Sequence, residues 1–340
     1  HTATPAVCKR CTNRCNLTIN DFGGLRKYIS GNRCEKGLGG ARSAELPNLY
    51  KFKYEYLRAL DESGKDESGC PLGTVGIPMG LNMYENLPFW HALLSRLGFR
   101  VVLSPPSNRK LYVKGQYTIP SDTVCYPAKL MHGHIEALLD QGVKTIFYPC
   151  LPYNFDEGIG DNHYNCPVVA YYPELLAANI DRLKGVRFLN PYFGIHREKD
   201  FRKFACGFFG EFSVPEKDVL EACALAYAAQ EKYYEAVRAE GARIIEYARG
   251  HGHGIIVLAG RPYHIDPEIN HGIDSLIGSF SLCVVSEDAV AHLVPKQDVR
   301  VLNQWTYHAR LYNAAKYVTT QPKDTSWTSC ISGCGIDAIT

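Results

Sequence analysis

The sequence predicts an α/β protein with two doubly wound, Rossmann-like modules, residues 73–192 and 213–340, after a cysteine-rich segment over residues 1–70. Short apolar runs alternate with amphipathic stretches of helical length, and this alternation occurs in both modules. Strands separated by helices of this length form parallel sheets with both faces covered. A chain of 340 residues is also long enough for two domains.

Composition limits the classes of function. Hydrophobic residues make up 46% of the chain and charged residues 21%, so the chain can form a core and is not a disordered tail. A net charge of +2 gives no reason to expect nucleic acid or an anionic membrane as a partner. No apolar run reaches the roughly 18 residues that span a bilayer, and no signal peptide is visible. We expect a cytoplasmic protein whose first residue is a processing product, a tag scar or the edge of an excised domain.

The N-terminal segment carries four closely spaced cysteines, namely Cys8, Cys11, Cys15 and Cys34. Four thiolates satisfy either a tetrahedral zinc ion or one iron–sulfur cubane, and basic neighbours lower the pKa of a thiol. We expect a metal site here, with two disulfides or free thiols as the alternatives. A helix over residues 44–60 and a charged linker over residues 61–69 are predicted to follow.

The first module has the alternation of a parallel α/β unit. Its first helix is amphipathic and is followed by Gly98, a residue typical of helix C-caps. The predicted helices cover residues 84–97, 128–141 and 173–183. The predicted strands cover residues 74–78, 99–103, 144–148, 168–171 and 186–190.

The second module begins with a long helix. Ser213 and Glu216 have the spacing of a capping box, and Gly250 is expected to end the helix. The continuous apolar run over residues 254–259 predicts a buried parallel strand. The remaining predicted elements are a helix over residues 269–280, a strand over 283–285 and a helix over 310–318.

Thirteen cysteines are too many for incidental core positions, and an odd number argues against a complete disulfide framework. Ligands of open α/β sheets bind beyond the carboxyl ends of the strands. The cysteines expected in such loops are Cys125, Cys150, Cys166 and Cys334. Thiolates from separate loops can hold an iron–sulfur cubane, although a single cysteine is more often a small buried hydrophobe.

Two further motifs carry weaker signals. The turn after the strand at 254–259 places Arg261 and His264 where a substrate or anion could bind, with a purely structural turn as the alternative. His132 and His134 are two residues apart on a predicted helix, so they point to different faces and make a poor metal pair. Neither a P-loop nor a dinucleotide-binding glycine motif occurs.

Several blocks of the sequence resemble a known family. They are VGIPMGLNMYENLPFWHALLSRLGFRVVLSPPS, SDTVCYPAKLMHGHIEALL, IFYPC, DNHYNCPVV, LAGRPYHIDPEINHGID and SGCGIDAIT. Together they resemble the dehydratase-like region of acyl-CoA dehydratase activase-related proteins, which are relatives of 2-hydroxyacyl-CoA dehydratases and of double-cubane cluster proteins. The N-terminal CKRCTNRCNLTI and GNRCEKG are similar to the segment that precedes this region in longer fusion forms.

The resemblance implies stacked flavodoxin-like domains and an oxygen-sensitive iron–sulfur cluster, either a 4Fe-4S or a double-cubane cluster, with Cys125, Cys150 and Cys334 as ligands. It implies three partners: an ATP-dependent activase of the actin-like ATPase class, a second dehydratase-like subunit or domain, and an acyl-CoA substrate. The chain departs from the pattern, since we find no activase domain and one dehydratase-like half. Cys166 and the extra Cys330 are reserve ligands.

The implied function is that of an iron–sulfur redox component of a dehydratase (a lyase) or of a reductase. Such a component takes an electron from the activase and passes it to a bound substrate. Two alternatives stay open: a non-enzymatic scaffold or electron relay with a structural metal site, and a double-cubane reductase of small unsaturated molecules. Substrate identity depends on the shape of a pocket, which the sequence does not specify.

Overall fold

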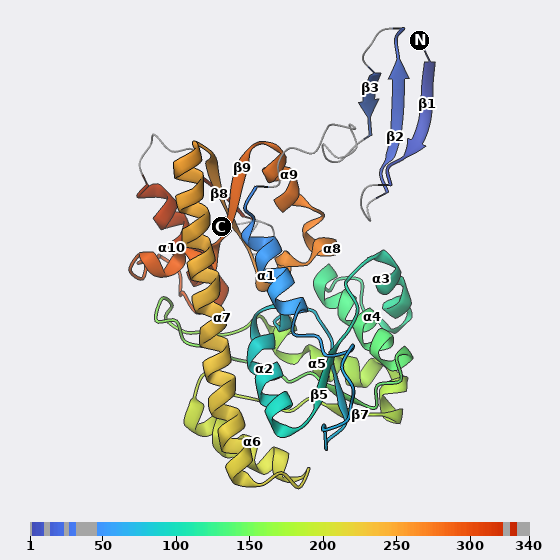
Figure 1. The fold of residues 1–340 in the computed structure, drawn as a ribbon, viewed down its shortest axis with the longest axis vertical. Coiled ribbons are helices and arrows are strands. Elements are labelled where there is room, and N and C mark those ends of the chain that lie inside the picture. The colour runs from blue at the N-terminus through green and yellow to red at the C-terminus, as the bar shows by residue number, and fades with distance from the viewer. Residues whose placement is uncertain (1, 10–13, 24–26, 32–45, 322–326, 332–340) are drawn as a thin grey trace.

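The computed structural model of the chain describes residues 2–9, 14–23, 27–31, 46–321 and 327–331, with the backbone alone at Lys27 and over 327–331. Within these residues the strands form three sheets (Figure 1). One is a small antiparallel sheet near the N-terminus. The other two are parallel, which confirms the predicted mixed α/β architecture.

The N-terminal sheet was not predicted from the sequence. It consists of β1 (Thr2–Val7), β2 (Asn16–Asp21) and β3 (Lys27–Ser30), in the order β1-β2-β3. Its pairs are antiparallel, and its small apolar cluster of Cys8, Cys15 and Leu17 is distinct from the main core. Most side chains of β1 are exposed, so the strand lacks the apolar alternation by which a sequence reveals a strand.

The first parallel sheet has the order β5-β4-β6-β7. Its strands are β4 (Thr74–Ile77), β5 (Arg100–Leu103), β6 (Thr145–Phe147) and β7 (Arg187–Leu189). The helices between them are α2 (Met83–Leu97), α3 (Arg109–Gly115), α4 (Tyr126–Asp140) and α5 (Pro167–Asn179), with 3-10 turns η2 (Gln116–Thr118) and η3 (Asp181–Gly185). The strand predicted at 168–171 is wrong, because these residues form the first turns of α5 after Pro167.

The second parallel sheet has the order β10-β8-β9. Its strands are β8 (Gly254–Ala259), β9 (Leu282–Ser286) and β10 (Trp327–Ile331). The apolar run of β8 is central in this sheet, as its sequence predicted. Its other elements are η4 (Pro262–Ile265), α8 (Pro267–Asn270), α9 (Ile273–Ser279), η5 (Glu287–Ala289), η6 (Ala291–Leu293) and α10 (Thr306–Thr319).

Three further helices connect or cover the sheets. They are α1 (Leu49–Arg58), α6 (Glu198–Gly210) and α7 (Glu216–His251). The 36-residue α7 runs past both sheets and packs along α2, while α1 packs against β9 (Figure 1). The buried apolar side chains of both sheets and these helices therefore form one continuous core.

Details of three helix ends differ from the predictions. Ser213 has a left-handed backbone (φ 61°), and Pro215 is the N-cap of α7 without a side-chain hydrogen bond, so the predicted capping box is wrong. The helix ends two residues later than predicted, with Gly252 (φ 69°) in place of Gly250 as the C-cap residue. The single helix predicted over 269–280 is interrupted, because His271 and Gly272 both have positive φ.

Candidate functional site

The loops at the carboxyl ends of the two parallel sheets face each other, and we call this region the junction. Tyr84 and Ser107 follow strands β4 and β5, and both donate hydrogen bonds to the carboxylate of Asp266, which follows β8. The Tyr84 hydroxyl lies 2.5 Å from Asp266 Oδ2. Because ligands of open α/β sheets bind beyond the carboxyl ends of the strands, the junction is the candidate functional site.

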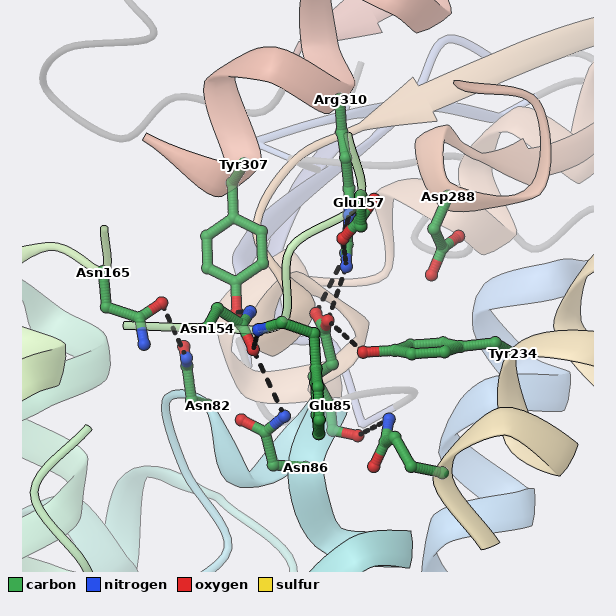
Figure 2. Close-up of polar contacts among 12 residues, drawn as sticks. Asn82, Glu85, Asn86, Asn154, Glu157, Asn165, Tyr234, Asp288, Tyr307 and Arg310 are labelled. Atoms are coloured by element: carbon green, nitrogen blue, oxygen red, sulfur yellow. Dashed lines mark hydrogen bonds and ion pairs between the residues drawn. The ribbon is translucent and has the colours of Figure 1, made fainter. Parts of the chain in front are cut away.

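Arg310 of α10 lies at the centre of the junction between two carboxylates (Figure 2). Its Nη1 donates to Glu85 Oε2 at 2.9 Å, and its Nε donates to both Glu157 oxygens at 2.8 and 2.9 Å. Tyr234 of α7 donates a further hydrogen bond to Glu85 at 3.0 Å. Two-pronged pairing of this kind is the arrangement in which a buried guanidinium is best stabilised.

A second buried ion pair lies beside the first. Lys53 of α1 contacts Asp288 at 2.5 Å, and Glu287 is buried next to it. Burial raises the pKa of Glu157 and raises the pKa of Glu287 to about 7. Among the described residues of this cluster, Glu85, Glu157, Glu287 and Asp288 thus share two cations, Lys53 and Arg310. The excess of carboxyl groups makes Glu157 and Glu287 the groups most easily protonated.

Buried amides extend the polar network toward the first sheet (Figure 2). Asn82 Nδ2 donates to Asn165 Oδ1 at 3.1 Å, and Asn154 Nδ2 donates to the Tyr307 hydroxyl at 2.9 Å. The Oδ1 atoms of Asn82 and Asn86 are buried without a hydrogen-bond partner among the described residues. Such atoms are rare in folded proteins, and they occur where water or a ligand completes the site.

A chain of hydroxyls connects Asp266 to His134 of α4. Ser107 Oγ, which donates to Asp266, also lies 3.0 Å from His134 Nε2, and Ser104 Oγ lies 2.8 Å from His134 Nδ1. Burial lowers the pKa of His134 to about 3, so the ring is neutral at pH 7. A neutral ring offers one donor and one acceptor, which suits a hydroxyl on each side.

Three of the cysteines singled out by the sequence lie at the carboxyl edge of the first sheet. Cys125 is the N-cap residue of α4, Cys166 is the N-cap residue of α5, and Cys150 follows β6 after two residues. Cys150 is fully buried, Cys125 is half-buried and Cys166 is exposed. Burial raises the pKa of the Tyr148 hydroxyl, and Cys150, Tyr172 and Cys125 raise it further, so both cysteines lie in the neighbourhood of Tyr148.

The surroundings of Cys150 keep its thiol protonated. Burial raises the pKa of Cys150 to about 11, and the carboxylate of Glu174 contributes to the shift. The hydrogen bond from Tyr192 acts in the opposite direction. The third predicted ligand, Cys334, lies outside the described residues, so the predicted trio stays a prediction.

Two of the four N-terminal cysteines are described. Cys8 and Cys15 are both buried, and the Cys8 backbone N–H donates to the Cys15 carbonyl oxygen at 2.9 Å, so the two residues lie side by side. Cys11 and Cys34 lie outside the described residues. In the part of the chain that is described, no group of three or more His, Cys, Asp or Glu side chains is arranged to hold a metal ion.

Arg261 and His264, the predicted substrate contacts, lie in the turn after β8 and are buried. His264 Nδ1 accepts a hydrogen bond from the Arg261 backbone N–H at 2.9 Å. The Arg261 guanidinium lies 3.2 Å from His308 Nε2 and 5.7 Å from the centre of the Tyr307 ring. These contacts give both residues a structural role, and their contact with a substrate stays a prediction.

Comparison with known proteins places the chain in a family. Residues 74–290 match the family described as CoA enzyme activase uncharacterised domain (DUF2229), and the match covers more than half of the chain. The chain belongs to this family. No curated protein matches the sequence. The family region runs from the first residue of β4 to just beyond β9, so it includes Cys125, Cys150 and Cys166. None of the described helices is both long enough and apolar enough to cross a lipid bilayer.

The sequence analysis missed the charged centre of the junction. Glu85 lies within the family region in a mostly apolar helical stretch, in which every residue from Met83 to Leu94 is buried except His91 and Ala92. A carboxylate in such a stretch was a signal that a buried cation must lie opposite. The identity of that cation, Arg310, could not be read from the sequence, because it lies 225 residues away.

Proposed function

We propose that the chain is an iron–sulfur redox component related to 2-hydroxyacyl-CoA dehydratases. It would take low-potential electrons from an ATP-dependent activase and pass them to a bound substrate. The observation that carries this proposal is the position of Cys125 and Cys150 in two loops at the carboxyl edge of one parallel sheet. The membership of the chain in a family of CoA enzyme activase-type proteins supports a partner of the activase or dehydratase kind.

Cys125 and Cys150 would supply two of the ligands of an iron–sulfur cluster. Cysteine thiolates are the usual ligands of such clusters, and hydrogen bonds to the sulfur atoms tune their potential. The Tyr148 hydroxyl is buried without a hydrogen-bond partner among the described residues, so it is available to donate to a sulfur atom. Ligation would displace the proton of the Cys150 thiol, as metal binding generally does.

The third ligand is proposed to be Cys334. Strand β10 runs parallel to β8, with Ile331 paired to Ala259, so both strands end at the edge of the sheet that borders the junction. Cys334 follows three residues later in the sequence. We further infer that the two parallel sheets form stacked Rossmann- or flavodoxin-like modules, and that a second dehydratase-like subunit or domain completes the site.

The residues of the chain would have defined tasks in such a site. A bound cluster supplies one-electron transfer. Tyr192 orients and polarises the Cys150 sulfur by hydrogen bonding, Tyr148 would donate to a sulfur atom of the cluster, and the burial of Cys150 keeps water away from it. An acyl-CoA is the proposed substrate, and Arg261 and His264 stay candidates for its contacts only if the turn after β8 rearranges.

Anaerobic reconstitution tests the cluster. The full chain is incubated with iron and sulfide without oxygen, and iron, sulfide and zinc are counted before EPR of the dithionite-reduced sample. We expect C125A and C150A each to lose the EPR signal and most of the iron. Cys223→Ala is the matched control, because Cys223 is a buried cysteine in the middle of α7 and should leave both unchanged.

Iron near zero in the reconstituted wild-type chain would favour the alternative, a scaffold or electron relay without a cluster. Equal iron content in wild type, C125A and C150A would overturn the ligand assignment. Electron delivery is tested separately, by mixing the loaded chain with an activase of the actin-like ATPase class and following ATP-dependent reduction.

The N-terminal cysteines are proposed to bind a metal of their own, zinc or a cubane, with Cys8, Cys11, Cys15 and Cys34 as ligands. The side-by-side burial of Cys8 and Cys15 supports this proposal. We expect C8S/C15S to lose one zinc ion or the four iron atoms of one cubane per chain, while the EPR signal attributed to Cys125 and Cys150 persists. Unchanged metal content in that variant would contradict it.

A further inference from the structure

A cavity lies beside the loops that follow β6 and β7 of the first parallel sheet, apart from the buried ion pairs of the junction. Its volume is about 470 Å³, within the range of small-ligand pockets. It is formed by the loop after β6, which contributes Tyr153 and His163, and by the segment after β7, which contributes His196, Arg197 and Asp200. The proposed cluster does not use these residues, so the inference below is independent of the proposed function.

The two histidines that line this cavity each carry an unsatisfied ring nitrogen. His163 Nε2 and His196 Nδ1 are both buried without a hydrogen-bond partner among the described residues, and the ring centres are 5.0 Å apart. A buried polar atom without a partner costs free energy, so it calls for a bound group that supplies the missing hydrogen bond. Both rings line the same cavity and lie next to each other, so one ligand in the cavity could serve both nitrogens.

One positive and one negative side chain line the cavity. Arg197 is the N-cap residue of the 13-residue α6, so the N-terminus of this helix borders the cavity, with Glu198 and Asp200 in its first turn. Asp200 Oδ2 lies 3.8 Å from Arg197 Nη1, so this carboxylate offsets the positive charge of Arg197. The Tyr153 ring packs on His196 at 4.6 Å between ring centres and holds the imidazole in place.

We propose that this cavity is a binding site for a small oxyanion group, a phosphate or a carboxylate. One anionic oxygen would accept a hydrogen bond from the N–H of His163 and another from the N–H of His196, while Arg197 supplies charge at the mouth. A metal ion is the less suitable ligand, since the described residues contain no group of three metal-binding side chains. The oxyanion belongs either to a phosphorylated ligand or to a carboxylic acid.

Binding of inorganic phosphate to the full chain tests the proposal. Phosphate is titrated into the protein at constant ionic strength set with chloride, and affinity is measured by calorimetry. Each imidazole forms a charge-assisted hydrogen bond, so H163Q/H196Q should weaken binding at least about tenfold. The matched control is H251Q/H253Q, which alters one exposed and one half-buried histidine at the C-terminal end of α7, with rings 6.4 Å apart. This control should bind phosphate as the wild type does.

A site-specific signal covers the case in which the double variant does not fold. The Cε1–H resonances of His163 and His196, assigned by single substitutions, should shift on addition of phosphate to the wild type, while those of His251 and His253 stay in place. Succinate in place of phosphate distinguishes a phosphorylated ligand from a carboxylic acid. A shift of the two resonances with phosphate alone indicates a phosphoryl group, and a shift with succinate indicates a carboxylate. No response to either anion, or the same response in both double variants, would overturn the proposal. So would a response of these resonances to zinc alone.

Discussion

Arg310 and Glu85 lie 225 residues apart in the sequence and form a doubly hydrogen-bonded ion pair with side chains only 2% and 4% exposed. Glu85 belongs to α2, which follows β4, and Arg310 belongs to α10, which precedes β10. The pair therefore joins the two parallel sheets at their carboxyl edges (Figure 2). The pair forms only when both sheets are folded, so its removal should lower the unfolding free energy of the whole chain.

Loss of Arg310 should strongly destabilise the chain. Arg310→Met leaves Glu85 and Glu157 buried side by side without their cation, and such a loss costs about 3–5 kcal/mol. Urea unfolding followed by circular dichroism measures the free energy of unfolding. A double variant, R310M/E85L, should recover part of the loss, because it removes one of the uncompensated carboxylates.

A surface arginine provides the control for this prediction. Arg96 pairs with Glu221 across α2 and α7, but the two side chains are 37% and 47% exposed. Arg96→Met should cost less than about 1 kcal/mol. A loss for R310M that is no larger than the loss for R96M would contradict the central role of the buried pair.

The crossing of α3 and α4 depends on two glycines. A Cβ on Gly133 would lie 2.0 Å from the Leu111 carbonyl oxygen, and a Cβ on Gly115 would lie 2.2 Å from the Gly133 nitrogen. Gly133→Ala forces the two backbones apart, and we expect a loss of about 3 kcal/mol or more in unfolding free energy, at the upper end of overpacking. Gly207 of α6 has nothing within 4 Å of an added Cβ, so Gly207→Ala should gain about 0.5–1 kcal/mol from its higher helix propensity. Equal changes in unfolding free energy for the two substitutions would contradict this explanation.

Local pattern explains which parts of the fold could be predicted. Strand β8 and helix α2 could be predicted from the sequence, since β8 is a continuous apolar run and α2 is amphipathic over 15 residues. The apolar Val168–Tyr171 was taken for a strand because buried helical and strand segments of four residues share one pattern. The family blocks located Cys125 and Cys150, but no local signal pairs Glu85 with Arg310 or His163 with His196. Those pairs arise from tertiary packing between segments far apart in the chain.

Acid should destabilise the protein through its buried histidines. Burial lowers the pKa of His134 to about 3 and that of His132 to about 4. The unfolded chain takes up protons near pH 6.5 while these rings stay neutral in the fold, so unfolding becomes easier as the pH falls below 6.5. Each ring contributes about 1.4 kcal/mol per pH unit, or about 2 kcal/mol between pH 6.5 and 5. His134→Gln should flatten the pH dependence of the unfolding free energy by that amount, whereas H251Q, at an exposed site, should leave it unchanged.

Glu287 should act with the opposite sign. Its pKa in the fold is about 7, above the ordinary value of 4.5, so the folded state holds a proton that the unfolded state releases between these two values. Its contribution to stability is therefore present at low pH and is lost as the pH rises toward 7. Glu287→Gln removes this compensation, and the loss of stability between pH 6.5 and 5 should become steeper than in the wild type. A slope that stays as in the wild type would show that Glu287 is ionised throughout.

The protonation state of Asp266 decides how the junction is held together. Its two oxygens accept from Tyr84, Ser107 and the Glu268 backbone N–H, all of which favour an ionised carboxylate, while burial raises its pKa. If the carboxylate is ionised, Asp266→Asn places an amide donor opposite the hydroxyl donors and should lower the free energy of unfolding by about 2–4 kcal/mol. Ser107→Ala removes one hydrogen bond and should lower it by only about 1 kcal/mol. Urea unfolding measures both losses, and hydrogen exchange over residues 262–270 should report the same loosening locally. Near-equal stability of D266N and wild type would instead mean that Asp266 carries a proton in the fold and donates it to Ser107 or Tyr84, which reverses the direction of the hydroxyl chain toward His134.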